Sequence, residues 1–357
     1  MITRTPARHP TVPGRWLSLA ALFGLAVLLV LGVASAGRLD PRLSVVAGLD
    51  DHALHAACVT RIARGEPYYA AVGTELRARG YPSASLPNWR TPLHYRFVAA
   101  LGTTGSKALL LTAGMLAVVA AAAAFSRRSR AAGLAAAIVL FGTMLPILFT
   151  PGRASLFGEQ WAGVLIALSL GAYHARWFTA GALTGVLAVF MRELAAPYAL
   201  VCGILALVRS RRTEAAVWIA GGVAYAIYYA IHVNAVLNAI QPGDYAWPQP
   251  WVRFLGWPFV LQTAWATGWT MILPYAATPV LAVLGLAGTA ARGVPPQLRM
   301  ALLLYVALFS VVGQEFNWYW GWVVAPLWGY ALLYAPAGLG RLIGSARGYD
   351  KLDVNAE

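Results

Sequence analysis

Few side chains in this sequence can do chemistry, and the carboxylates and arginines among them fall in short groups. The 357 residues include only 13 acidic side chains against 27 basic ones. Asp50, Asp51 and His52 stand together, and Arg192 is followed directly by Glu193. A carboxylate can accept a proton from a hydroxyl group, and a guanidinium group can bind two oxygens of a phosphate at once. These groups could therefore provide a general base and an anion site for a phosphate-bearing substrate.

Three further acidic positions, Glu159, Glu193 and Glu315, stand where an apolar run begins or ends. Ionisable groups at membrane depth are unfavourable unless they are paired or face a wet cavity. We therefore expect these side chains to border a cavity that opens to one face of the membrane. The alternative is local pairing, in which Arg192 and Glu159 only tie two helices together. The arginines expected on the same side are candidates for binding phosphate: Arg192, Arg153, Arg90 and Arg253.

The composition places these residues in a membrane protein. Hydrophobic residues make up 59% of the chain and charged residues only 11%, and the mean hydropathy is +0.63. A soluble domain carries roughly 25% charged residues, so a water-soluble globule and a disordered chain are both excluded. The net charge of +14 does not indicate nucleic-acid binding, because the arginines stand in short loops between apolar runs.

The apolar runs predict an all-α, polytopic bundle of about ten transmembrane helices. They cover residues 16–36, 108–125, 131–149, 160–173, 178–191, 194–208, 215–233, 270–290, 300–312 and 320–340. The runs 178–191 and 194–208 are short and could be two spans or one re-entrant pair. We expect a single transmembrane domain over 1–344, with a long outer loop at 37–107, and a short cytoplasmic tail over 345–357.

The loop charges predict the orientation. Arginines outnumber acidic residues in the loops that lie inside when both termini are cytoplasmic, which is how multi-pass proteins are oriented. The first run ends in Ala34-Ser35-Ala36, which resembles a signal-peptide cleavage site, but its length favours an uncleaved first span. The expected location is the bacterial inner (plasma) membrane, and most tryptophans fall on the outer side.

The first outer loop predicts two amphipathic helices, 50–64 and 66–80. In the first, apolar residues recur every fourth position from Leu54, and Asp51 and His55 share another face. Gly65 and Gly80 mark the two ends. Asp50 or Asp51 could simply cap the first helix, although two adjacent acids exceed what a cap needs.

This arrangement resembles the GT-C superfamily of glycosyltransferases. The features that carry the resemblance are the acidic pair after the first span, the Gly-x-x-Tyr that follows the first helix, and Pro-Leu-x-Tyr before the second span. The residues are Asp50, Asp51, Gly65, Tyr68, Tyr69, Pro92, Leu93 and Tyr95. They lie within residues 16–125. Glu159-Gln160-Trp161 and Arg192-Glu193 are similar to later helix ends of bacterial members.

The resemblance implies a hexosyltransferase of the mannosyltransferase-like kind that takes its sugar from a polyprenyl-phosphate-linked donor. It places the catalytic carboxylate at Asp50 or Asp51 and the acceptor, a glycan or a lipid, at the outer leaflet. Many members carry a C-terminal soluble domain that is not found in these 357 residues, so the acceptor stays open. The residues expected to shape the site are Glu159, Glu193, His52, Tyr68, Tyr69, Trp161, Glu315, Asn317 and Trp318.

No cofactor is assigned from the sequence. No zinc or other metal-ligand spacing occurs, although Asp50, Asp51 and His52 could hold a divalent cation weakly. The segment 314–320 suits sugar or lipid-head recognition, and its alternative is an ordinary interfacial turn. The alternative function is a polytopic transporter or a lipid-sugar flippase, which predicts charges deep inside spans and two pseudo-symmetric halves. A non-catalytic scaffold would leave the carboxylates without a reason to cluster.

Overall fold

A computed structural model describes residues 12–36, 50–149 and 154–348 of the chain. The described residues form helices and no strand, which confirms the all-α prediction. The α-helices are α1 Val12–Ser35, α2 Asp51–Ala63, α3 Tyr68–Ala78, α4 Pro92–Ser126, α5 Arg130–Gly142, α6 Leu145–Phe149, α7 Gly158–His174, α8 Phe178–Met191, α9 Ala196–Val208, α10 Arg212–Ala239, α11 Gly256–Trp265, α12 Trp269–Ile272, α13 Ala277–Gly288, α14 Pro296–Phe309, α15 Gly321–Leu333 and α16 Ala335–Ala346. Short 3-10 turns are η2 Leu86–Asn88, η3 Ala154–Leu156, η4 Glu193–Ala195 and η5 Glu315–Trp320.

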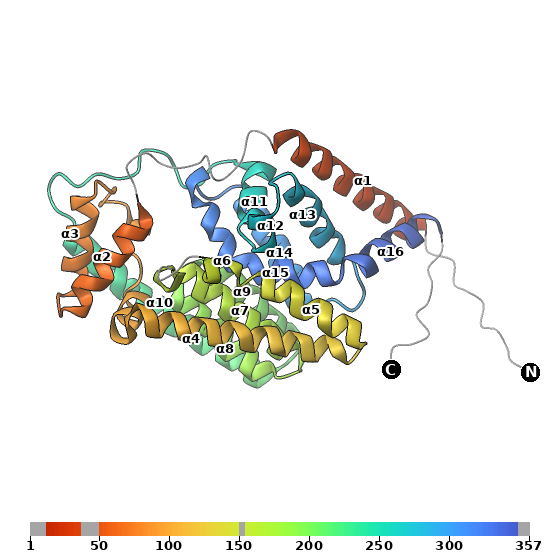
Figure 1. Ribbon diagram of the computed structural model, residues 1–357, viewed down its shortest axis with the longest axis horizontal. Coiled ribbons are helices and arrows are strands. Elements are labelled where there is room, and N and C mark those ends of the chain that lie inside the picture. Colours follow the sequence, from red (N-terminus) through yellow and green to blue (C-terminus); the bar gives the residue numbers. More distant parts are fainter. Residues whose placement is uncertain (1–11, 37–49, 150–153, 349–357) are drawn as a thin grey trace, which may run out of the picture.

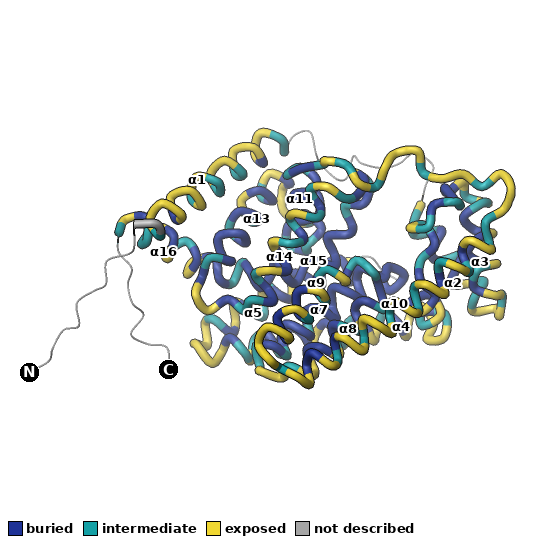
Figure 2. Tube along the Cα trace, turned by 180° about the vertical axis from the view of Figure 1, so that it is seen from behind, coloured by how far each residue is buried: buried dark blue, intermediate teal, exposed yellow. Residues whose placement is uncertain are grey.

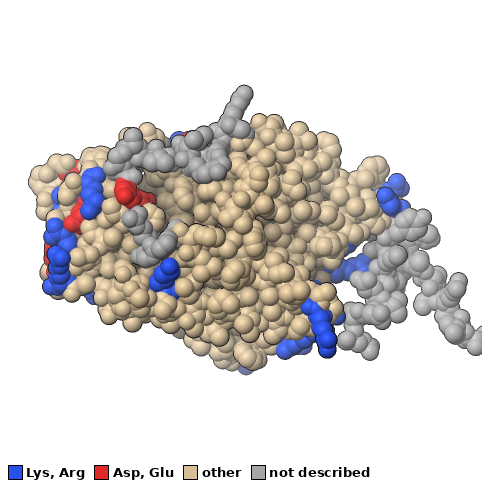
Figure 3. Space-filling model, viewed as in Figure 1, with Lys and Arg blue, Asp and Glu red and all other residues tan. Residues whose placement is uncertain are grey.

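The helices form an elongated bundle with α2 and α3 at one end and the start of α1 with α16 at the other (Figure 1). Arg15 at the start of α1 donates a hydrogen bond to the carbonyl of Ala346, so the two helix ends lie together. On the face shown in Figure 3, charged side chains gather toward the two ends, and the wide band between them is nearly uncharged. We call the two ends of the bundle the α2–α3 end and the α1–α16 end.

Three described helices are long and apolar enough to cross a membrane: Gly14–Ser35, Leu86–Ser126 and Arg212–Ala239. Helix α15 with its preceding turn and α16 would make a fourth if this pair, bent by 56°, is one span. Helix α1 is exposed along most of its length (Figure 2). These apolar helices identify a membrane protein. The prediction of about ten spans stays a prediction, because several expected spans are shorter helices, among them α5, α8, α9, α13 and α14.

Helix α7 lies at the centre of the bundle, and the helices around it pack against it. Its residues are buried along almost the whole length, and it packs against α4, α8 and α15. A Cβ atom added to Gly163 would lie 2.1 Å from the carbonyl oxygen of Trp322, so only glycine permits this approach of α7 to α15. This close packing brings the start of α7, which carries Glu159, near the start of α15, which carries Trp322.

Local signals explain the helices at the α2–α3 end. Asp50 accepts a hydrogen bond from the backbone N–H of Ala53 and caps α2. Gly65 and Gly80 have φ values of 89° and 68°, which a side chain would disfavour, and they follow the ends of α2 and α3. Helix α2 buries Leu54, His55, Cys58 and Val59 against α3 and α4, so tertiary packing covers its apolar face.

Several helix boundaries differ from those expected. Helix α4 begins at Pro92, so residues 92–107 are helical rather than loop, and the helix kinks at Gly102, where φ is 69°. Proline suits the first turn of a helix because its missing N–H has no partner there. The runs 178–191 and 194–208 form α8 and α9, separated by an extended Arg192. The expected run 320–340 is divided at Tyr334 into α15 and α16.

The two ends of the bundle should lie on opposite sides of a membrane. We expect Arg64→Cys, between α2 and α3, and Arg347→Cys, after α16, to react with a membrane-impermeant thiol reagent from opposite sides of sealed vesicles. The native thiols add little background, because Cys58 and Cys202 are buried, and burial followed by the Glu75 charge raises the pKa of Cys58 to about 12. Labelling of both variants from one side would contradict this arrangement, and detergent-solubilised protein provides the control for reactivity.

Candidate functional site

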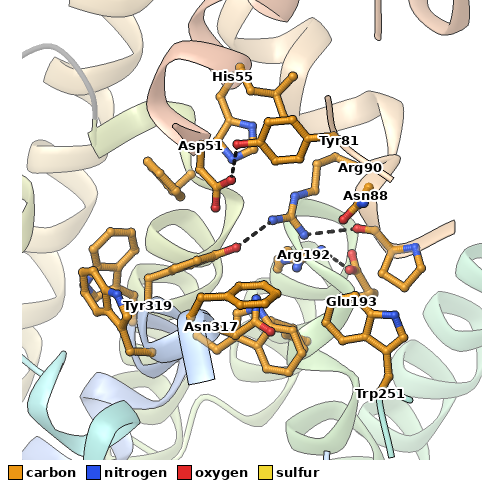
Figure 4. A pocket seen from close by; sticks show the side chains of 18 of the residues that line it. Asp51, His55, Tyr81, Asn88, Arg90, Arg192, Glu193, Trp251, Asn317 and Tyr319 are labelled. Atoms are coloured by element: carbon orange, nitrogen blue, oxygen red, sulfur yellow. Dashed lines mark hydrogen bonds and ion pairs between the residues drawn. The ribbon is translucent and has the colours of Figure 1, made fainter. Parts of the chain in front are cut away.

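A cavity of about 660 Å³ lies at the α2–α3 end of the bundle. Its walls come from the start of α2, the segment 81–90, the start of the α8–α9 connection, the segment that precedes α11, and η5 with the start of α15. Figure 4 shows polar side chains from several of these elements turned toward one space. Eight of the residues proposed from the sequence line it: Asp50, Asp51, His52, Arg90, Arg192, Glu193, Asn317 and Trp318.

The two adjacent aspartates differ in what their side chains do. The Asp50 carboxylate caps α2 through the N–H of Ala53 at 3.1 Å and is exposed. The Asp51 carboxylate is half-buried and accepts a hydrogen bond of 2.7 Å from the hydroxyl of Tyr81. Burial, and then the charge of Asp51, raises the pKa of Tyr81, so this hydroxyl keeps its proton and remains a donor. Both aspartates line the cavity, but Asp50 also caps α2, whereas Tyr81 holds Asp51 in place.

His55 lies one helical turn beyond Asp51 and also lines the cavity. It is buried, and its Nδ1 forms a hydrogen bond with the hydroxyl of Tyr95. Burial, followed by the charge of Arg90, lowers the pKa of His55 well below its ordinary value. The imidazole is therefore neutral at pH 7, and its ring packs edge-on against Phe157 with 4.9 Å between ring centroids. The same phenyl ring contacts His52 at 4.7 Å.

Two arginines and two glutamates form a charged cluster on the side of the cavity near α7. Arg192 donates from Nε to Oε1 of Glu159 at 2.8 Å and also pairs with Glu193. Arg90 lies 3.7 Å from the same Glu159 oxygen and donates to the hydroxyl of Tyr319 at 3.3 Å. The local pairing considered for Arg192 and Glu159 is thus present. Because two carboxylates already contact Arg192, Arg90 is the cation of this cluster with more capacity left for a substrate anion.

Aromatic side chains make much of the remaining wall. They are Tyr229, Trp247, Trp251, Phe316, Trp318, Tyr319, Trp320 and Trp322. Trp247 contacts Phe316 with 5.1 Å between ring centroids, and Trp251 stacks on Trp320 at 6.2 Å with an angle of 15° between the planes. Flat aromatic faces suit the C–H faces of sugar rings and the chains of lipids. In the turn that carries Asn317, the Gln314 and Asn317 side chains cap each other's backbone, so the amide has a structural task as well.

The segment 241–255 crosses this end of the bundle and is anchored on both sides. On one side, Arg77 donates from Nε and Nη2 to Asp244, each at 2.8 Å, and Ser83 donates to Asp244 at 2.7 Å. These bonds from Arg77 hold the pKa of Asp244 well below its usual range. On the other side, the N–H of Gly313 donates to the carbonyl of Trp251 at 2.9 Å. This segment, which we call the strap, carries Trp247 and Trp251 to the cavity.

Other residues proposed from the sequence lie outside the lining. Tyr68 donates its hydroxyl proton to the Arg90 carbonyl, and Tyr69 bonds Nδ1 of His232 at 3.1 Å. Trp161 is buried and donates to the carbonyl of Ser155 at 3.0 Å. These three side chains therefore support the segments around the cavity rather than border it.

Two acidic positions have different surroundings. Glu159 is buried behind Arg192, with a side chain 1% exposed, and the expectation that it borders the cavity is wrong. The same expectation is wrong for Glu315, which is 67% exposed, lies 3.5 Å from Arg253 and points to the surface at the start of η5. Arg153 lies outside the described residues.

Sequence reasoning did not propose His55, Tyr81, Asn88 or Tyr229 as site residues, and it included Tyr319 only as part of the segment 314–320. The helix spacing does place His55 on the same face as Asp51, four positions earlier. Tyr81 and Asn88 stand in irregular or 3-10 segments, where no periodicity tells which side chains turn inward.

Within residues 12–36, 50–149 and 154–348, no three His, Cys, Asp or Glu side chains converge as a metal site would require. The chain thus assembles no metal site from Asp50, Asp51 and His52 alone. Comparison of the sequence and structure with protein families, with curated proteins and with solved structures found no match.

The Arg77–Asp244 pair should anchor the strap. We expect Asp244→Asn to lower the free energy of unfolding by about 2 kcal/mol, since it removes the carboxylate charge and one of the two oxygens that accept from Arg77, and to speed tryptic cleavage at Arg253. In the native protein this stabilisation is present above the ordinary pKa of the carboxyl, and it is lost as the pH falls through the lower folded pKa. Thermal unfolding and limited proteolysis measure both effects.

Glu315→Gln provides the control, because it removes an exposed carboxylate beside Arg253, the arginine at which cleavage is measured. We expect it to change neither stability nor cleavage. Equal behaviour of the Asp244 and Glu315 variants would show that the pair does not anchor the strap.

Proposed function

We propose that this protein is a membrane glycosyltransferase of the GT-C type. It transfers one sugar, with inversion, from a polyprenyl-phosphate-linked donor to a glycan or lipid acceptor at the outer leaflet. The observation that carries the proposal is that Asp51 and Arg90, which come from different elements, border one cavity with an aromatic wall. A carboxylate base, a phosphate-binding cation and a surface for sugar rings are the three groups that this reaction needs.

The chemistry follows from these positions. Asp51 removes the proton from the acceptor hydroxyl as the hydroxyl oxygen forms a bond to the anomeric carbon of the donor. The bond between that carbon and the phosphate oxygen breaks, and its electron pair leaves on the polyprenyl phosphate. Arg90, supported by Arg192, stabilises the charge that develops on the departing phosphate. Tyr81 holds the Asp51 carboxylate in place through its hydroxyl.

An apolar groove lies beside the cavity and suits the lipid part of the proposed donor. It has a volume of about 680 Å³ and is lined by α8, α9, α10 and α14. Leu194 borders the cavity and Ala196 borders the groove, and the rings of Tyr229 in the cavity and Tyr225 in the groove stack with centroids 5.9 Å apart. A phosphate in the cavity could therefore continue into an isoprenoid chain in the groove. The sidedness of the proposal comes from the arginine-rich loops at the α1–α16 end, which are typical of a cytoplasmic face.

Mass spectrometry of purified protein in proteoliposomes tests the proposal directly. We expect release of polyprenyl phosphate together with a glycosylated acceptor when a polyprenyl-phosphate sugar is supplied. The two products should appear in equal amounts. Movement of the intact donor across the vesicle membrane without release of polyprenyl phosphate would favour a flippase and contradict the enzyme.

Asp51 should matter more than Asp50. We expect Asp51→Asn to lower kcat about 100- to 10,000-fold, the usual contribution of a general base, while the amide oxygen still accepts the hydrogen bond from Tyr81. Asp50→Asn keeps a good helix cap, so its kcat should stay within about threefold of the native value. Rates are measured on inserted, folded protein with saturating donor. Full activity of Asp51→Asn would remove the proposed base.

Filling the groove should impair only long-chain donors. A Cβ atom added to Gly222 meets no atom within 4 Å, so we expect Gly222→Phe to fold and to raise the KM for a long polyprenyl donor at least about tenfold. A short-chain donor should be used as before. Gly24→Phe on α1 is the matched control, because a side chain there also meets nothing. Equal loss with both donors would argue against a chain in this groove.

A further inference from the structure

The two carboxylates that contact Arg192 have very different surroundings. The Glu159 side chain is 1% exposed, lies behind the cavity wall, and does not border the cavity. The Glu193 side chain is 30% exposed and borders the cavity. Figure 4 shows the contact of Arg192 with Glu193 at the edge of the open space. The Arg192 side chain itself is only 4% exposed, so its charge needs at least one close partner.

Glu159 is the partner shared by both arginines. Its Oε1 atom accepts from Arg192 at 2.8 Å and lies 3.7 Å from Nη2 of Arg90. Two guanidinium groups this close would repel each other without a negative charge between them. Glu159 comes from the first turn of α7, where the helix dipole also favours a negative charge. Glu159 therefore keeps the two cations together. It cannot move away without leaving a buried positive charge unpaired.

Glu193 is placed differently. It follows Arg192 directly, at the start of η4, and no described residue other than Arg192 makes an ion pair with it. The four side chains Arg90, Arg192, Glu159 and Glu193 have no net charge together. An arriving phosphate would give this buried cluster a net negative charge unless one carboxylate moved away. Only Glu193 has water to move into.

We propose that Glu193 is an internal counter-ion that occupies Arg192 in the empty site and is displaced when a phosphate anion binds, whereas Glu159 is a positioning residue that holds both arginines. This inference rests on the proposed function, because it assigns the phosphate of the lipid-linked donor to Arg90 and Arg192. When the incoming group is the singly charged phosphodiester of a lipid-linked sugar, the exchange leaves the charge of the cluster unchanged. No covalent bond forms or breaks in this step.

Neutralising Glu193 and Glu159 separately tests the proposal, because the two substitutions should change phosphate binding in opposite directions. Binding of a short-chain polyprenyl phosphate and of inorganic phosphate is measured on the full-length protein in nanodiscs. We expect Glu193→Gln to lower the Kd about 3- to 10-fold, because the phosphate no longer competes with a carboxylate. We expect Glu159→Gln to raise the Kd at least about tenfold, because the arginines lose their shared partner. The probe that binds more tightly identifies the source of the phosphate.

Glu214→Gln is the matched control for loss of a buried carboxylate. Glu214 is also 1% exposed, and it pairs with Arg211 at 3.4 Å and with the hydroxyl of Tyr173 at 2.8 Å in the half of the bundle away from the cavity. We expect it to leave the Kd unchanged even where its thermal stability falls. We expect Glu193→Gln to lower the KM for the donor by about the same factor as the Kd, which a merely structural role would not produce.

The outcomes separate the two proposals. If the native protein binds polyprenyl phosphate but both substitutions weaken binding, Glu193 is not a displaceable counter-ion, and the glycosyltransferase proposal stands. If Glu159→Gln binds as the native protein does, the positioning role is wrong. If the native protein binds neither probe, both the proposed function and the exchange are overturned.

Discussion

The structure depends on one constraint: a charge near the interior of an apolar bundle must meet an opposite charge or water. Glu159 and Arg192 satisfy it with a direct bond, and Arg90 satisfies it by lying between the same carboxylate and a cavity. Because the pairing is needed whether or not a substrate is present, it fixes the relative positions of α7, the α8–α9 connection and the segment before α4. The cavity is the space that these fixed elements leave open at the α2–α3 end of the bundle.

The surrounding packing makes that arrangement specific. Gly163 lets α7 approach the backbone at Trp322, and this brings the aromatic turn of η5 opposite the charged cluster. The strap 241–255 closes the third side, since Asp244 is bound to Arg77 and the carbonyl of Trp251 to the N–H of Gly313. Charged groups and tryptophans thus line the same cavity. A substrate with an anionic centre and flat apolar faces is complementary to both kinds of side chain at once.

Much of the local structure could be predicted. The helices at 51–63 and 68–78 follow from the Asp50 cap, the apolar spacing from Leu54, and the glycines that end them. The lining residues Arg192 and Glu193 were proposed because ionisable side chains beside apolar runs need a reason to be there, and Asp51 and His52 because they stand together at the head of an amphipathic helix. Glu315 met the first criterion and Trp161 was proposed from the resemblance, yet one lies on the surface and the other supports the backbone, because nothing local shows which way a side chain at a helix end turns.

Residence in a membrane and the all-helical class were determined by the sequence itself, because apolar runs, caps and helix-ending glycines act over a few neighbouring residues. Only the tertiary structure decided that Glu159 meets Arg192, that Asp50 caps a helix while Asp51 binds Tyr81, and that Tyr81, Asn88 and Tyr319 line the same cavity. Those contacts link segments far apart in the chain. They depend on how closely whole helices pack, which no short stretch of sequence specifies.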